Sequence, residues 1–91
     1  MFQRLQVRLF RLNDEILRLQ EEERLTVEEL YVLEHLDDDA RRDAAVGGPL
    51  ERDDARGTAA DVARFRRAVT SLREERERLE VKRDRLLRRL D

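Results

Sequence analysis

Apolar residues recur at alternating intervals of three and four positions along the first part of the chain. The same phase passes through the polar residues Glu23 and Thr26 and resumes at Leu30 and Leu33. This is the a/d spacing of a heptad repeat, which places the apolar side chains on one stripe of a helix that packs against a second helix. The pattern predicts a helix over about residues 2–24. Its stripe consists of Phe2, Leu5, Leu9, Leu12, Ile16 and Leu19.

The polar interruption contains a signal for a helix start. Thr26 and Glu29 have the spacing of a capping box, with Thr26 as the N-cap and Glu29 reaching back from the third helical position. A second helix is therefore predicted over about residues 27–45. Because the apolar phase is unchanged across the interruption, a kink near residues 24–26 or a nearly continuous helix is favoured over two separate helices.

The sequence Gly47-Gly48-Pro49 predicts the end of this second helix. Glycine readily adopts the left-handed C-cap conformation, and proline does not continue a helix. A loop is predicted over residues 47–57, and Thr58 is the expected N-cap of a last helix over about residues 59–90. The apolar stripe of that helix consists of Val62, Phe65, Val69, Leu72, Leu79, Leu86 and Leu90.

Two arginines, Arg76 and Arg83, occupy a positions of the last stripe. Folding the chain back at residue 51 or 52 gives an antiparallel hairpin that places Arg76 opposite residue 27 and Arg83 opposite residue 20. Glu23 then falls between them, so the hairpin is expected to contain a charged layer. Such a layer either fixes the helix register at some cost in stability, or the two arginines hold a phosphate or nucleotide between protomers.

A second apolar stripe lies one position away from the first and consists of Phe10, Leu17 and Tyr31. A two-helix hairpin cannot cover both stripes. An apolar stripe of this kind normally packs against another helix, so we expect a homodimer that forms a helical bundle.

Composition limits the class of protein further. The chain has 91 residues, of which 46% are charged and 4% aromatic, and it has no cysteine. One helical domain covering residues 1–91 and no disulfide are expected. Arg4, Arg8 and Arg11 interrupt the first turns, so neither a signal peptide nor a membrane span is expected. The expected location is the cytoplasm.

The net charge of −2 is unevenly distributed. Residues 25–46 carry seven acids against two arginines, whereas residues 58–91 carry eleven bases against seven acids. The simplest interpretation is that the basic helix lies beside the acidic one, and that acids on the neighbouring helix offset the like charges at Arg85 and Arg89. A basic helix that binds nucleic acid is the alternative. It is not favoured, because no aromatic residue lies among Lys82, Arg83, Arg85, Arg88 and Arg89.

Four acidic residues, Asp37, Asp38, Asp39 and Asp43, lie near the expected turn. They are interpreted either as a solvated helix end or as an acidic tip that contacts a partner. A hairpin with an acidic tip resembles the coiled-coil regulators that insert such a tip into the secondary channel of RNA polymerase. The resemblance covers the hairpin and the acidic residues alone, and it implies RNA polymerase as a partner. His35 has no second ligand cluster, so no metal and no cofactor are expected.

No pattern points to catalysis, because the chain has no glycine-rich phosphate loop and no nucleophile beside a base. The sequence favours a non-enzymatic helical module for protein–protein interaction or regulation. A small bacterial transcription regulator that binds a sigma factor or RNA polymerase is one form of it. The alternatives are a helical bundle that senses a phosphate or nucleotide or binds nucleic acid, and a structural or assembly scaffold.

Overall fold

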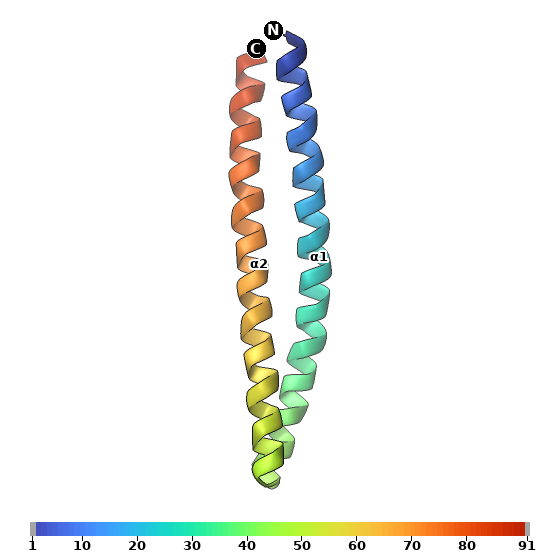
Figure 1. The fold of residues 1–91 in the computed structure, drawn as a ribbon, viewed down its shortest axis with the longest axis vertical. Helices are drawn as coiled ribbons and strands as arrows, with labels where there is room; N and C mark the ends of the chain where they lie inside the picture. Colours follow the sequence, from blue (N-terminus) through green and yellow to red (C-terminus); the bar gives the residue numbers. More distant parts are fainter. Residues whose placement is uncertain (1, 91) are drawn as a thin grey trace. The chain divides into compact units, whose positions relative to one another are not determined.

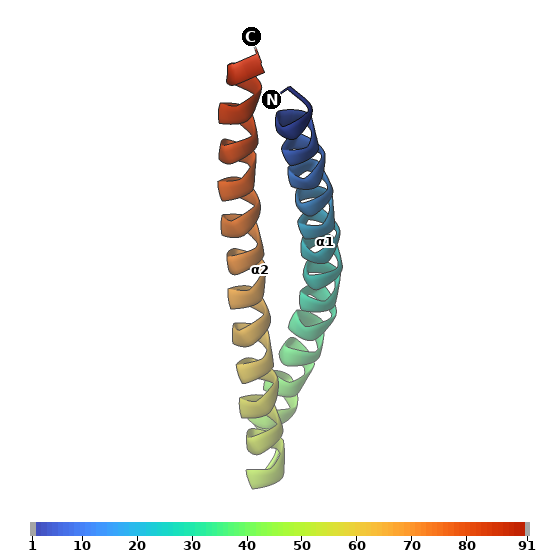
Figure 2. The same ribbon diagram turned by 45° about the horizontal axis from the view of Figure 1, so that its top comes forward.

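Two long helices make up nearly all of residues 2–90, the part of the chain that the computed structural model describes. Helix α1 spans Phe2–Val46 and helix α2 spans Pro49–Leu90. The two helices pack against each other as a hairpin (Figures 1 and 2). The prediction of an all-α helical hairpin is therefore confirmed.

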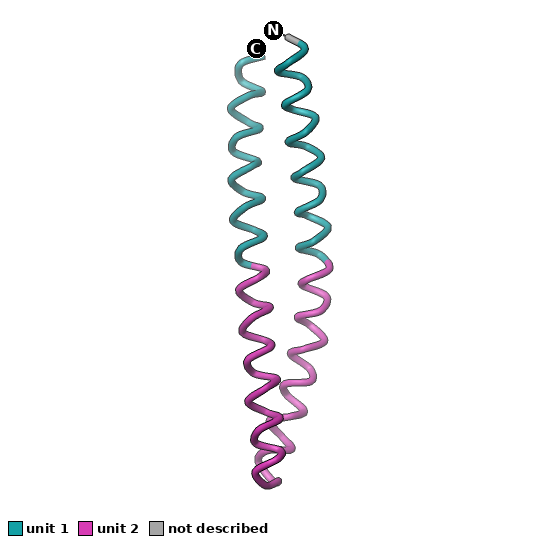
Figure 3. Tube along the Cα trace, in the orientation of Figure 1, with its two compact units in different colours: residues 1–24, 70–91 teal, residues 25–69 magenta. Residues whose placement is uncertain are grey.

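The chain divides into two compact units (Figure 3). Unit 1 consists of residues 1–24 and 70–91, and unit 2 of residues 25–69. Unit 1 pairs the first half of α1 with the second half of α2. Unit 2 pairs the second half of α1 with the first half of α2, across the turn at Gly47 and Gly48.

The predicted stripes form the core of each unit. In unit 1, Leu9, Ile16, Leu19 and Leu86 are buried, and in unit 2 Val62 and Val69 are buried. The side chain of Phe2 lies outside the described part. We refer to the inward a/d positions of both helices as the seam. In unit 1 the seam of α1 runs over residues 5, 9, 12, 16, 19 and 23, and that of α2 over residues 72, 76, 79, 83, 86 and 90.

The predicted loop over residues 47–57 is wrong, because α2 already begins at Pro49. Proline suits the first position of a helix, since its missing N–H would have no partner there. Glu51 accepts a hydrogen bond at 2.8 Å from the backbone N–H of Gly48, and Arg52 N–H donates to the carbonyl oxygen of Gly48 at 3.2 Å. Gly48 is thus the N-cap of α2, and Glu51 supplies the returning bond of a capping box.

The two other predicted helix starts are wrong as well. Thr26 and Thr58 lie inside α1 and α2, respectively. Gly47 does not adopt the expected left-handed C-cap, since no described residue has a positive φ. The local capping signals are outweighed because each stripe continues in phase through the threonine. The kink near residues 24–26 stays a prediction.

The continued phase places unexpected residues on the seam of unit 2. On α1 the spacing of four and three leads from Leu33 to Asp37, Ala40 and Ala44, and on α2 it leads back from Val62 to Thr58 and Ala55; all five positions are buried or partly buried. These side chains are small or polar, so the apolar pattern alone did not reveal them.

Candidate functional site

A charged layer crosses the seam of unit 1. Glu23 on α1 accepts hydrogen bonds from Arg76 Nε at 2.9 Å and from Arg73 Nε at 2.6 Å, both on α2. Arg76 also donates to Glu80 at 2.7 Å. The Glu23 side chain is 15% exposed and that of Arg76 is 22% exposed, so this pair is largely removed from water. Arg73 and Glu80 were not anticipated from the sequence.

The charges of this layer hold one another in their ionised forms. Hydrogen bonds from Arg73 and Arg76 lower the pKa of Glu23 below its ordinary value. Hydrogen bonds to Glu80 and Glu23 raise the pKa of Arg76. Any external anion would have to compete with two carboxylates for the Arg76 guanidinium.

Arg83 does not join this layer. Its Nε lies 3.4 Å from Asp84 on the same helix. The expected register put residue 27 opposite Arg76, whereas the structure puts Glu23 there, about one helical turn earlier. The cause is the turn, which lies at Gly47 and Gly48 instead of residues 51 and 52.

Asp37 departs most clearly from the expected acidic tip. It is only 4% exposed. One carboxylate oxygen lies 3.1 Å from the Thr58 hydroxyl, which also lies 3.1 Å from the carbonyl oxygen of Ala55, so the single hydroxyl proton has two acceptors within hydrogen-bond distance. The other oxygen pairs with Arg41 at 2.9 Å. Asp37 is therefore an internal link between the helices of unit 2, and the expectation that it is solvated is wrong.

The remaining acidic residues are exposed on α1. Asp38, Asp39 and Asp43 are exposed, and Asp39 pairs with Arg42 at 2.7 Å. Within the described residues no group of acidic, histidine or cysteine side chains is arranged to hold a metal ion. His35 Nδ1 instead lies 2.9 Å from the carbonyl oxygen of Tyr31, and the rings of these two residues are 4.3 Å apart.

The large exposed apolar side chains gather on the outer side of α1. Phe10 and Leu17 in unit 1 and Tyr31 in unit 2 are each more than 60% exposed, as expected for an uncovered second stripe. Unit 2 adds Leu25, Val32 and Leu36, each 51% exposed. Their spacing of seven and four keeps these three on one side of the helix, whereas Tyr31 lies about 100° away from Val32 around the helix, in line with Phe10 and Leu17.

The comparisons with known proteins give no relative from which a role can be transferred. No protein-family model matches the chain, and neither the curated proteins nor the solved structures contain a match. No helix within residues 2–90 has a stretch that is both long and apolar enough to cross a membrane.

Proposed function

We propose that this protein is a non-enzymatic helical interaction module that binds a protein partner through the outer side of α1. The observation that carries the proposal is the exposed group Leu25, Tyr31, Val32 and Leu36 in unit 2. Leu25, Val32 and Leu36 are spaced by seven and four residues along one side of α1, and all four side chains are more than half exposed. An apolar helix side of this kind binds another helix through anchors at intervals of three, four and seven residues.

A second copy of the chain is the proposed partner. A two-helix unit has only one shared seam, so its outer apolar side chains need another helix to leave water. Closed two-fold dimers are the commonest soluble assemblies. The dimer would combine two hairpins into a helical bundle, and the same surface would serve a regulatory partner in exchange for the second copy.

The oligomeric state tests this proposal. We expect the chain to have the mass of a dimer by light scattering at micromolar concentration, and Leu36→Glu to shift it toward the monomer. Leu50→Glu is the matched control, since Leu50 is also an exposed leucine of unit 2 but lies on α2. We expect it to keep the mass of the wild type.

Two outcomes would contradict the proposal. If the wild-type chain is fully helical and monomeric over the whole concentration range, the proposed dimer does not form and the outer side of α1 does not bind a second copy. Equal dissociation by Leu36→Glu and Leu50→Glu would place the interface elsewhere.

A further inference from the structure

Two rows of cations lie along unit 1. On α1 they are Arg4, Arg8 and Arg11, and on α2 they are Arg78, Lys82, Arg85 and Arg89. Their spacings of four and three place each row on one side of its helix. All seven residues are exposed, and within residues 2–90 none of them pairs with a carboxylate. We refer to them as the basic rows.

The lack of a carboxylate partner among residues 2–90 distinguishes these cations from other arginines of the chain. Arg18, Arg42, Arg56 and Arg64 each pair with an acid three or four residues away. Acids on the neighbouring helix were expected to offset the charges of Arg85 and Arg89, but no carboxylate within residues 2–90 pairs with either of them. Residues 2–12 of α1 contain three arginines and no acid, so the other helix of unit 1 adds positive charge at its first turns.

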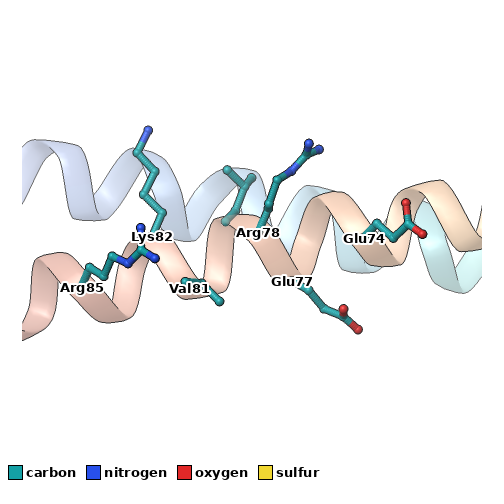
Figure 4. Close-up of a pocket in the computed structure, with 7 residues that line it drawn as sticks. Glu74, Glu77, Arg78, Val81, Lys82 and Arg85 are labelled. Carbon is teal, nitrogen blue, oxygen red and sulfur yellow. The ribbon is translucent and has the colours of Figure 1, made fainter.

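Each basic row borders a shallow hollow in the surface of unit 1. The hollow on α2 has a volume of about 640 Å³ and is lined by Arg78, Lys82 and Arg85 around Val81. Glu74 and Glu77 also line it; Figure 4 shows Glu74 at one end, and Lys82 and Arg85 at the other.

The hollow on α1, of about 410 Å³, repeats this arrangement with three arginines. Arg4, Arg8 and Arg11 surround Val7, and none of the described acids lines this hollow. Both hollows thus combine three cations with a half-exposed valine.

We propose that the basic rows of unit 1 bind the phosphate backbone of a nucleic acid without reading its sequence. Six of the seven cations are arginines, whose planar guanidinium groups match phosphate oxygens in a bidentate manner. Three cations over about 10 Å of helix correspond to about three successive phosphates of one strand. Recognition is limited to the backbone, because neither row contains an aromatic residue for stacking on bases.

The same cations suit a membrane surface less well. A helix that lies in a lipid interface carries a broad apolar side with large residues opposite its cations. Among the described residues of unit 1, α1 exposes two large apolar side chains, Phe10 and Leu17, with Val7 between the arginines, which is too narrow for such a side. The nucleic-acid proposal is independent of dimerisation through the outer side of α1.

Binding of labelled duplex DNA and of single-stranded RNA of mixed sequence, followed by fluorescence anisotropy with the full chain, tests the proposal. We expect saturable binding to at least one of the two probes at about 50 mM salt, weakening steeply at about 200 mM. The triple variants Arg4→Gln/Arg8→Gln/Arg11→Gln and Arg78→Gln/Lys82→Gln/Arg85→Gln should each lower affinity at least about tenfold. Each should also flatten the dependence on salt.

The matched control is Arg42→Gln/Arg56→Gln/Arg64→Gln, which removes the same charge from exposed arginines of unit 2. It should bind like the wild type, and circular dichroism should show that all variants stay helical. Equal losses in the control would mean that binding follows overall charge, which overturns the proposal. Absence of binding to both nucleic acids at low salt also overturns it. So does binding confined to phosphatidylglycerol vesicles or to polyglutamate.

Discussion

Asp37 occupies the same heptad phase as Leu30 and Leu33, and this placement determines its burial. A buried carboxylate needs hydrogen-bonding partners, because an unpaired charge away from water is costly. Thr58 and Arg41 provide these partners at 3.1 Å and 2.9 Å. Asp38, one position further along, lies outside that phase and is exposed.

This difference predicts unequal effects of two neighbouring substitutions. Asp37→Ala should lower the free energy of unfolding by about 1–3 kcal/mol, because it removes the buried link between the helices. Asp38→Ala should change it by no more than about 0.5 kcal/mol. Both variants gain the same helix propensity from alanine, so the difference between their urea midpoints isolates the buried contacts. Equal midpoints would show that Asp37 contributes no more than a surface residue.

At the scale of elements, α2 begins at Pro49, earlier in the chain than its apolar residues indicate. The first turns contain Asp53, Asp54 and Gly57 and carry no large apolar residue on the seam. Gly57 lies inside the helix, and an added Cβ would meet no atom within 4 Å. At Gly47, by contrast, a Cβ would lie 2.8 Å from the carbonyl oxygen of Asp43 and 2.6 Å from Glu51 Cγ.

Replacing Gly57 and Gly47 by alanine should therefore have opposite effects on the stability of the protein. Gly57→Ala should stabilise the protein by about 0.5–1 kcal/mol, because alanine loses less backbone entropy in a helix. Gly47→Ala should destabilise it by roughly 1–3 kcal/mol, because the neighbouring backbone must shift. Thermal unfolding followed by circular dichroism at one protein concentration measures both. A Gly57→Ala variant that melts below the wild type would mean that residues 50–57 are not helical.

The sequence predicted the hairpin and most of its seam because leucine, isoleucine and valine at a/d spacing can be recognised without coordinates. It failed where capping residues and seam residues coincide. Thr58 satisfies the rule for a helix start, yet it faces Asp37 across unit 2. The Pro49 and Glu51 signal for the true start of α2 was present in the sequence, but Gly47-Gly48-Pro49 was interpreted solely as a helix end. The one-turn error in register and the omission of Arg73 follow from this misplaced turn. The Arg76–Glu80 pair lies within α2 at a spacing of four, so it could have been predicted from the sequence.

At the scale of the whole molecule, the described carboxyl groups with a resolved pKa shift are all shifted downward. They are Glu15, Glu21, Glu23 and Glu51, and hydrogen bonds from arginines or backbone N–H groups cause the shifts. A lowered pKa means that the unfolded chain binds more protons than the folded one in acid. Stability from these groups is therefore fully present above their ordinary pKa of 4.5 and is lost as the pH falls through the lowered values.

Glu23 should dominate this acid response, because it is the one of the four that links α1 to α2. Glu23→Gln should lower the free energy of unfolding by about 1–3 kcal/mol at neutral pH, since it removes the carboxylate from two arginines. The difference from the wild type should shrink toward zero as the pH falls below 4.5, because the protonated Glu23 then resembles glutamine.

Glu29→Gln, a change of equal charge at an exposed position of the same helix, is the control and should stay within about 0.5 kcal/mol of the wild type. Melting temperatures recorded from neutral pH into acid test this expectation. A deficit of Glu23→Gln that stays constant across the whole range would show that the layer owes its stability to packing, and the charge assigned to Glu23 would then have no role in holding the helices of unit 1 together.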